Sequence, residues 1–333
     1  MIVLGIETSC DETAAAIVKD AKTVCSNVVS SSLLFHKKYG GIVPEIAFRK
    51  QMETITQVVD CALKDAGIGL EDIDLISVTD GPGLLGSLLV GVSFAKALSY
   101  SRNIPLVGVN HLYSHIYAGF LNIGPGNFPF VSLVVSGGHT SLYYVRSLNK
   151  ISLLGSTQDD ACGEAFDKVA KILNLGYPGG PVIEKFAHKG DPRKIKFACS
   201  NTRGPLDFSF SGIKTAVLYY VQKNFKSPRV TGYKPQVADI CASFQECAIN
   251  TLVEKSMLAC SAKKVRTLVV GGGVAANLTL REKLNKSAAG KKIKVIFPTK
   301  EFCMDNAAMV AGLGCWLYKS GRKSNLNLNV CLD

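Results

Sequence analysis

The chain has 333 residues and a mass of 35.6 kDa, which is enough for two domains of ordinary size. Hydrophobic residues make up 47% and charged residues 19%, a composition that predicts buried cores and argues against disorder. A net charge of +12 favours a polyanionic partner. We expect a cytoplasmic protein without a membrane segment, because no apolar run could cross a bilayer and MIVLGIETSCDET resembles a strand, not a signal peptide.

The cysteines indicate the redox state of the protein, and the basic residues indicate where a polyanion could bind. Eleven cysteines are scattered from Cys10 to Cys331 without a CxxC pair, which indicates reduced thiols and neither a disulfide framework nor a structural zinc site. The basic residues form clusters that are candidates for polyanion contacts, at residues 36–41, 191–196, 225–229, 262–266, 290–294 and 318–323.

The first elements predicted are two strands joined by a polar turn over residues 2–18, then a third strand over 22–32. Apolar residues at helical spacing predict a helix over 43–67 that stops at its final glycine. Residues 73–83 read as a strand entering a Gly-Pro-Gly turn, and 84–102 as the helix that leaves this turn.

The same order then begins again. A strand, a Gly/Thr turn and a second strand are predicted over 130–147, followed by a third strand over 151–159. Helices follow over 162–176 and 181–190, and a strand, glycine turn and helix over 265–285. Residues 200–260 lack this pattern and appear mostly helical in sequence, as an insertion would.

This repetition predicts a duplicated α/β fold of the actin/Hsp70/sugar-kinase type, with two lobes around a nucleotide cleft. We expect an N-terminal lobe of residues 1–125 plus 305–333. The C-terminal lobe would be residues 126–304, with the helical insertion near 200–260.

The stretch NHLYSH raises the possibility of a metal site. Asn110 is a good helix N-cap, and the helix after it would point His111 and His115 in the same direction. The alternative is two histidines that share a helix face without a ligand. Zinc proteases of the HExxH type have a general-base glutamate after the first histidine; this chain has Leu112 there, which argues against a peptidase.

A third ligand is needed, and residues 301–318 offer Asp305 just before a helix expected to begin at Asn306. The alternative role of Asp305 is a helix N-cap. Cys303 is a softer candidate ligand. Two histidines and one carboxylate with open positions suit iron(II) or zinc.

The glycine turns offer contacts to a nucleotide. Gly137 and Gly138 could bind an acyl phosphate through backbone N–H groups, although a tight hairpin is the simpler reading. Further candidate contacts are Gly180, which allows close approach to a ribose, and polar side chains at Asp167, Glu184 and Asn277. Carboxylates are dense in ETSCDET (7–13), where Glu7 stands in place of the first Asp of a sugar kinase; this argues against simple ATP phosphotransfer.

Together these motifs resemble the bacterial TsaD type of the Kae1/TsaD/Qri7 family, formerly described as O-sialoglycoprotein endopeptidases. The resemblance covers residues 2 to about 315 and depends on GIETSCDET, YGGIVPE, GPGLLGSLLVG, the His111/His115 pair, LVVSGGHT, GEAFDKVAK, GYPGGP, DFSFSGIKT, GGGVAAN and FCMDNAAM. It implies transfer of a threonylcarbamoyl group from threonylcarbamoyl-adenylate to N6 of the adenosine 3′ of the anticodon, in tRNAs that read codons beginning with A.

The resemblance also implies the site and the partners. The metal ligands would be His111, His115 and Asp305, holding one divalent ion, Fe(2+) in preference to Zn(2+). The partners would be a TsaB-like paralogue, a TsaE-like ATPase and the tRNA anticodon loop. The adenylate contacts would be Val134, Val135, Ser136, Gly137, Gly138, Asp167, Gly180, Glu184 and Asn277.

Two points of the chemistry stay open. Asp11 or Glu12 is expected to take the proton from the attacking amine. The alternative functions are a metallopeptidase and a non-catalytic ATP-binding scaffold of the same fold. Inactive paralogues tend to lose metal ligands, whereas this chain retains all three.

Overall fold

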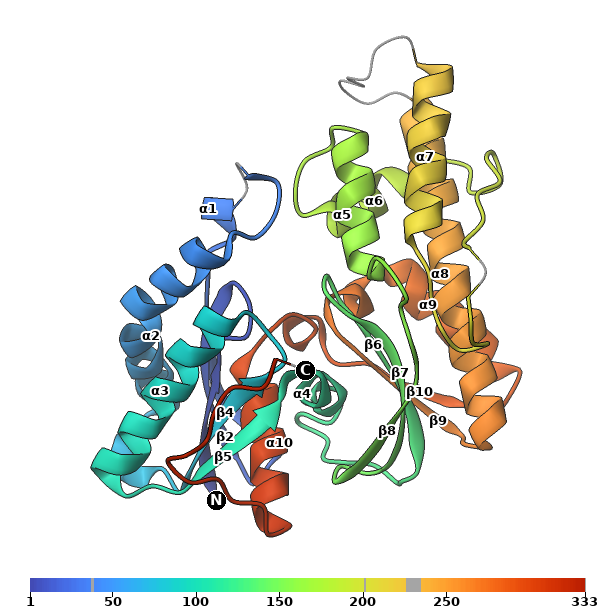
Figure 1. Ribbon diagram of the computed structural model, residues 1–333. Helices are drawn as coiled ribbons and strands as arrows, with labels where there is room; N and C mark the ends of the chain where they lie inside the picture. The colour runs from blue at the N-terminus through green and yellow to red at the C-terminus, as the bar shows by residue number, and fades with distance from the viewer. Residues whose placement is uncertain (37–38, 201, 226–234, 333) are drawn as a thin grey trace. The chain divides into compact units, whose positions relative to one another are not determined.

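A computed structural model describes residues 1–36, 39–200, 202–225 and 235–332 of the chain (Figure 1). They form two compact units: unit 1 is Met1–Asn127 with Pro298–Asp333, and unit 2 is Phe128–Phe297. The lobes predicted from the sequence change at 125/126 and 304/305, whereas unit 1 of the structure also includes residues 126–127 and 298–304. Within the described residues, none of the helices is both long and apolar enough to cross a membrane.

Unit 1 is built around one mixed sheet with strands in the order β3-β2-β1-β4-β5. The pairs β1–β2 and β2–β3 are antiparallel, and the pairs β1–β4 and β4–β5 are parallel. The strands are β1 Ile2–Glu7, β2 Glu12–Lys19, β3 Thr23–Ser31, β4 Leu75–Gly81 and β5 Leu106–Asn110.

Helices cover both faces of this sheet (Figure 1). One face packs on α2 and α3, where Leu4 and Ile6 of β1 join Ile55 and Val92 in a buried cluster. The other face packs on α10, which contacts β1, β2, β4 and α4. The helices are α1 Leu33–His36, α2 Pro44–Ala66, α3 Leu85–Arg102, α4 His111–Ala118 and α10 Ala307–Lys319, with short 3-10 turns at Leu70–Asp72 and Lys300–Phe302.

Unit 2 repeats the topology of unit 1. Its sheet has the order β10-β9-β6-β7-β8, with β6–β7 and β7–β8 antiparallel and β6–β9 and β9–β10 parallel. The strands are β6 Phe130–Val135, β7 Thr140–Ser147, β8 Lys150–Ser156, β9 Thr267–Gly271 and β10 Lys294–Ile296. Each strand therefore has a counterpart in unit 1, and the prediction of a duplicated α/β fold is confirmed.

The helices of unit 2 are α5 Cys162–Ile172, α6 Gly179–Ala187, α7 Ser211–Asn224, α8 Pro235–Lys263 and α9 Leu278–Ala289, with a 3-10 turn at Gly273–Ala276. The segment 200–260 is helical in its described part, as α7 and most of α8. The expected basic cluster at 225–229 lies outside the described residues except for Phe225, and so do residues 37 and 38 of the first cluster.

Three local expectations were wrong. The helix after Asp305 begins at Ala307, because Asn306 is the N-cap and accepts a hydrogen bond from Met309 N. The helix expected to begin at residue 181 begins at Gly179, so Glu184 is not in its first turn. Strands β5 and β10 were also missed, since both are short and carry little of the pattern that marks a strand.

Candidate functional site

The histidine pair lies on α4, directly after β5. Asn110 ends the strand, and its side-chain oxygen accepts a hydrogen bond from Tyr113 N at 3.1 Å, which caps the helix as predicted. The helix then places His111 and His115 one turn apart, with ring centroids 4.6 Å apart and the ring planes at 79°. Both rings are buried, so their polar atoms depend on partners inside the protein.

Asp305 reaches this pair from the other end of the chain. Its Oδ1 lies 3.0 Å from His115 Nε2 and 3.7 Å from His111 Nε2. Because Asn306 is the cap of α10, the carboxylate of Asp305 is not used as a helix N-cap. The three residues form a group whose candidate ligand atoms all lie within 4.8 Å of one another, entirely within unit 1.

Glu7 lies next to His111, a contact that no sequence motif predicted. The Glu7 side chain is 1% exposed, and its Oε2 lies 3.1 Å from His111 Nδ1. Ser9 N donates to the other carboxylate oxygen, and Thr79 Oγ1 donates to Oε2 at 2.7 Å. The signal in the sequence was a glutamate at the end of an otherwise apolar strand, IVLGIE, because a carboxylate there is expected to be buried and to need a partner.

The charges in this cluster support one another. Burial alone would raise the pKa of Glu7, but the neighbouring His111 outweighs it, and the pKa is lowered. Burial likewise disfavours charge on His111, yet the carboxylates of Glu7 and Asp305 raise its pKa to about 9. A Glu7 carboxylate accepting from Nδ1–H leaves Nε2 of His111 free to act as a ligand atom.

The residues fit a divalent metal ion. Two imidazole nitrogens and one carboxylate oxygen converge, which is a donor set that suits iron(II) or zinc. Cys303 is not part of the group, and its thiol lies 3.4 Å from the carbonyl oxygen of Thr299. The two histidines differ in what holds their second ring nitrogen. His111 Nδ1 faces Glu7, whereas the buried Nδ1 of His115 has no hydrogen-bond partner among the described residues.

The two candidate bases lie at the start of β2 in the same unit, with Asp11 directly before the strand and Glu12 as its first residue. Asp11 is buried, and its Oδ2 has no hydrogen-bond partner among the described residues. The pKa of Glu12 is well above its usual range because of burial first, then the negative charges of Asp305 and Asp11. Glu12 therefore holds its proton more tightly than an ordinary glutamate, and Asp11 is the better-placed acceptor of the two.

The predicted adenylate contacts gather at one end of the sheet in unit 2. Val134 and Val135 end β6, and the turn that follows exposes Gly137 and Gly138, with open space where their side chains would be. Ser136 anchors the turn, since its N–H donates to His139 O and its carbonyl accepts from Gly163 N at the start of α5. The backbone N–H groups of the two glycines thus lie in an exposed turn that is anchored by hydrogen bonds of Ser136.

The remaining candidate adenylate contacts lie on α5, on α6 and before α9. Asp167 on α5 accepts from Gly179 N at 2.6 Å, next to Gly180, which also has open space around its α-carbon. Glu184 on α6 accepts from Leu278 N at 2.7 Å, and Leu278 begins α9. Burial raises the pKa of Asp167.

Asn277 is the N-cap of α9 and the last of these candidate contacts. Its Oδ1 caps α9 by accepting from Leu280 N, and its Nδ2 donates to Gln245 at 2.9 Å. Gly272, with φ of +93°, passes so close to the carbonyl of Val135 that a side chain would collide with it. Gly272 therefore lies against the end of β6, and residues predicted from four separate motifs meet in one region.

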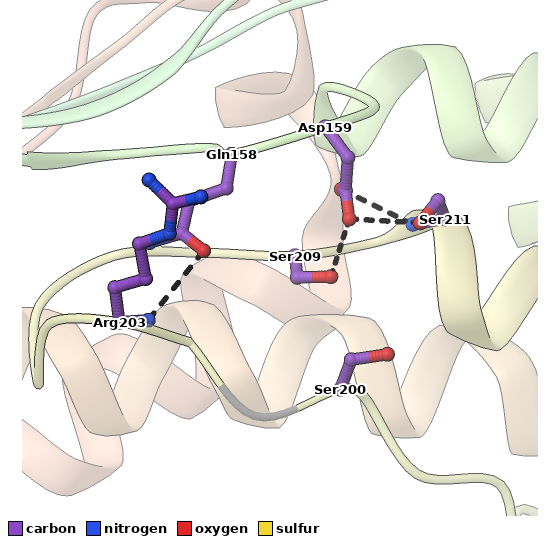
Figure 2. A pocket seen from close by; sticks show the side chains of 6 residues that line it. All are labelled: Gln158, Asp159, Ser200, Arg203, Ser209 and Ser211. Carbon is purple, nitrogen blue, oxygen red and sulfur yellow. Dashed lines mark hydrogen bonds between the residues drawn. The ribbon is translucent and has the colours of Figure 1, made fainter.

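A separate polar pocket of about 500 Å³ contains none of the predicted site residues (Figure 2). Asp159 lies in its wall and accepts hydrogen bonds from Ser209 Oγ, Phe210 N and both the backbone and hydroxyl of Ser211. Burial opposes the ionised form of Asp159, but these bonds outweigh it and lower the pKa. The carboxylate thus joins the loop after β8 to the start of α7.

Comparison with known proteins identifies relatives along almost the whole chain. Residues 23–312 match the model of a family described as TsaD: tRNA N6-adenosine threonylcarbamoyltransferase. A protein of that name from Symbiobacterium thermophilum is 51% identical over 99% of this chain and 95% of its own length. Proteins of the same name from Clostridium kluyveri (49% identical, 98% and 96%) and Syntrophus aciditrophicus (50% identical, 99% and 96%) are similar to the same extent.

Solved structures with little sequence similarity share the fold. HypF from T. kodakarensis aligns with 96% of this chain and 48% of its own at a TM-score of 0.61 and 15% identity. Component A of (R)-2-hydroxyglutaryl-CoA dehydratase from Acidaminococcus fermentans aligns with 96% of this chain and 98% of its own, at a TM-score of 0.54 and 17% identity. The fold is therefore the actin/Hsp70/sugar-kinase type predicted from the repeated motifs.

Proposed function

Because the chain belongs to the TsaD family of tRNA N6-adenosine threonylcarbamoyltransferases, we propose that it modifies the adenosine 3′ of the anticodon in tRNAs that read codons beginning with A. The threonylcarbamoyl group of threonylcarbamoyl-adenylate is transferred to N6 of that base, and AMP is released. The observation that carries this proposal is the near-complete alignment, at about half identity, with transferases of that name.

His111, His115 and Asp305 would hold one divalent ion, Fe(2+) in preference to Zn(2+). Such an ion, when bound, supplies a Lewis acid that polarises the carbamoyl carbonyl. Glu7 fixes the ring of His111 by accepting from its Nδ1–H, so that Nε2 points toward Asp305. This geometry is set before any ligand arrives, because Glu7 is itself held by Ser9 and Thr79.

The candidate adenylate contacts in unit 2 would bind the adenylate. The exposed N–H groups of Gly137 and Gly138 suit a phosphate oxygen, and the turn is already held by Ser136. Asp167, Gly180, Glu184 and the Asn277 region would contact the nucleoside. Both Glu184 and Asn277 already make internal hydrogen bonds, so contacts at these positions would use their remaining lone pairs or neighbouring backbone.

In the transfer step, the N6 nitrogen forms a bond to the carbamoyl carbon, and the bond from that carbon to the phosphate oxygen breaks. AMP leaves with the electron pair, and the amine loses a proton. Asp11 would take this proton, because its buried Oδ2 has no hydrogen-bond partner in the described part of the chain, whereas the raised pKa of Glu12 makes it the poorer acceptor. Since an amine conjugated with adenine is a weak nucleophile, positioning supplies much of the rate.

The partners and location proposed follow from the family. An anticodon loop is single-stranded, so its target base can leave the stack without the opening of a duplex. We also propose that a TsaB-like paralogue and a TsaE-like ATPase act with this chain in the cytoplasm. Neither partner is needed to define the chemistry of the transfer itself.

The proposal is tested by incubating the purified protein and its partners with threonylcarbamoyl-adenylate and unmodified tRNA, followed by mass spectrometry of the nucleosides. We expect the modified adenosine with the wild type and its loss in His111→Ala and Asp305→Ala. Lys64→Ala, an exposed change on the far side of α2 from the core, serves as the control. Full activity in both metal-ligand variants would refute the role given to them, and cleavage of a glycoprotein would favour the peptidase alternative.

A further inference from the structure

Only unit 2 has a net positive charge. Residues 128–297 contain 25 Lys and Arg against 11 Asp and Glu, whereas the other residues contain 13 against 15. Unit 2 thus has a net charge of +14 and unit 1 of −2, which gives the total of +12. A polyanion would therefore be attracted to unit 2 in particular.

Two basic clusters that are distant in the sequence meet at one edge of the sheet in unit 2. Strands β9 and β10 are parallel, with Lys294 opposite Thr267, and Lys294 N donates to Arg266 O at 2.8 Å. The turns that enter the two strands therefore lie side by side. We call this group the basic edge; it consists of Lys263, Lys264, Arg266, Lys291, Lys292 and Lys294, all of them exposed.

The cations of the basic edge are not used for internal ion pairs. Ion pairs in unit 2 are made by Lys168, Arg193, Lys214 and Lys283, among others, and no member of the edge takes part in one within the described residues. One or two cations after a helix would offset its dipole, but six exceed that need. Arg146 and Lys150, both exposed at the β7–β8 turn, extend the positive charge along the same edge because β7 runs antiparallel to β6.

The backbone offers a second, independent observation. Lys264 and Lys292 follow α8 and α9 at equivalent positions, and both have φ of +54°, in the left-handed region. Glycine or asparagine is the usual residue at such a helix end, because a lysine side chain is strained there. Three of the other non-glycine residues with positive φ in the described chain are asparagines: Asn103, Asn122 and Asn174. Folding alone does not explain two lysines at these positions.

We propose that the basic edge binds the phosphate backbone of the tRNA, away from the base that reacts. This inference rests on the proposed function and adds a contact surface to it. The edge lies at the opposite ends of the strands from the Ser136–Gly138 turn, about 17 Å away along a five-residue strand. An RNA much longer than this can contact both ends of the unit, with the edge holding the backbone without reading its sequence.

An RNA backbone fits better than an anionic membrane. A membrane-binding surface combines cations with exposed large apolar side chains that enter the lipid. Between the cations of the edge, the apolar residues are Val265, which is buried, and Ile293, which is half-buried.

The test compares tRNA binding by the wild type and by the variant Lys264→Gln/Arg266→Gln/Lys291→Gln/Lys292→Gln, measured by fluorescence anisotropy over a range of salt concentrations. We expect at least tenfold weaker binding near 0.1 M salt and a salt dependence shallower by about two to three in log–log slope. A control variant with the same loss of charge in unit 1 is Lys19→Gln/Lys22→Gln/Lys64→Gln/Arg102→Gln, at exposed positions. It should retain most of the affinity.

A second variant separates lost contacts from lost folding. Lys264→Gly/Lys292→Gly removes two charges and also the left-handed strain, so it should melt no earlier than the wild type and still bind tRNA more weakly. Equal tRNA affinity and salt slope in wild type and edge variants would overturn the proposal, as would an equal loss in the unit 1 control. Sedimentation with vesicles containing phosphatidylserine that depends on the edge, with tRNA binding unaffected, would also overturn it.

The outcomes for the surface and for the proposed function are distinguishable. Normal, salt-sensitive tRNA binding that depends on the edge, but without any transfer of the threonylcarbamoyl group, would overturn the proposed function alone. Transfer that proceeds with unchanged KM for tRNA in the edge variants would overturn the surface alone.

Discussion

Glu7 shows how a single buried side chain sets the chemistry of its neighbours. Its carboxylate is almost fully buried, accepts from Ser9 and Thr79, and lies 3.1 Å from His111 Nδ1. A carboxylate in this position fixes the histidine tautomer and strengthens it as a ligand. The residue therefore acts on a metal ion through His111, as a positioning residue.

We predict that Glu7→Gln lowers the affinity for Zn(2+) or Fe(2+) by about 10- to 100-fold, because the amide retains the shape of the side chain but loses its charge. Titration calorimetry and the metal content after dialysis measure this without any assay of transfer. The matched control is Ser9→Ala, which removes the other neighbour of His111 Nδ1 but retains the Glu7 carboxylate. Unchanged metal affinity in Glu7→Gln would show that the carboxylate does not support the ligand.

A pair of thiols in unit 2 gives a prediction about pH. Cys199 and Cys247 have their sulfur atoms 3.7 Å apart, and the hydrogen bond from Cys247 lowers the pKa of Cys199 to about 7 in spite of burial. Because the thiolate is the reactive form, alkylation of Cys199 by iodoacetamide should increase as pH rises through about 7. Burial alone raises the pKa of Cys241, so Cys241 should remain unreactive at that pH.

Mass spectrometry of peptides after timed alkylation measures this dependence. In Cys247→Ala the hydrogen bond is absent, so the midpoint for Cys199 should move upward toward that of an ordinary thiol near 8.5. An identical midpoint in the wild type and in Cys247→Ala would contradict the assigned cause.

At the scale of elements, α10 carries Asp305 to the histidine pair, and its packing on β1 depends on small residues. A side chain at Gly5 would collide with the carbonyl of Ala307 and come within 2.8 Å of Ala311 Cβ. Gly314 fits against Ser77 in β4 in the same way. The helix can thus lie directly on the sheet, and its first residues follow immediately after the Asp305 ligand position.

We predict that Gly5→Ala destabilises the protein by about 1–3 kcal/mol through overpacking and weakens metal binding, since α10 must move with Asp305. Urea unfolding and metal titration measure the two effects. Gly290→Ala is the control, because nothing lies within 4 Å of a side chain there and its φ of −62° suits alanine. Stability equal to the wild type in Gly5→Ala would mean that the contact between β1 and α10 yields easily.

The elements that the sequence predicts well are those with strong local signals. Gly67 ends α2 in the left-handed conformation, and Asn110 caps α4, as the sequence indicates. The repeated strand–turn–strand order correctly predicts a duplicated fold, since a sheet pattern of that length is seldom accidental. By contrast, β10 is three residues long and is defined only by its parallel partner β9, which local patterns do not encode.

The candidate site depends on contacts between residues that are distant in the sequence, and local sequence patterns do not predict such contacts. His115 and Asp305 are 190 residues apart, so the residue types made Asp305 a candidate third ligand, but no local pattern shows that the two lie together. The role of Glu7 depends on which way His111 turns within the folded sheet. Similarly, the basic edge appears only when β9 and β10 pair and bring two basic clusters together.

At the scale of the whole molecule, charge and chemistry are divided between the two units. Unit 1, with a net charge of −2, contains the candidate metal ligands and Asp11; unit 2, with +14, contains the candidate adenylate contacts and the basic edge. Binding of tRNA should therefore decrease steeply with salt, while binding of the small, less charged adenylate should change much less.

The most direct test of the proposed transfer is a single-turnover reaction with threonylcarbamoyl-adenylate labelled in its threonine carbon atoms, using the protein, its partners and unmodified tRNA. We predict that each AMP released is matched by one labelled threonylcarbamoyl group on the adenosine 3′ of the anticodon. Release of AMP with the label recovered as free threonine, or no label in that nucleoside, would contradict it.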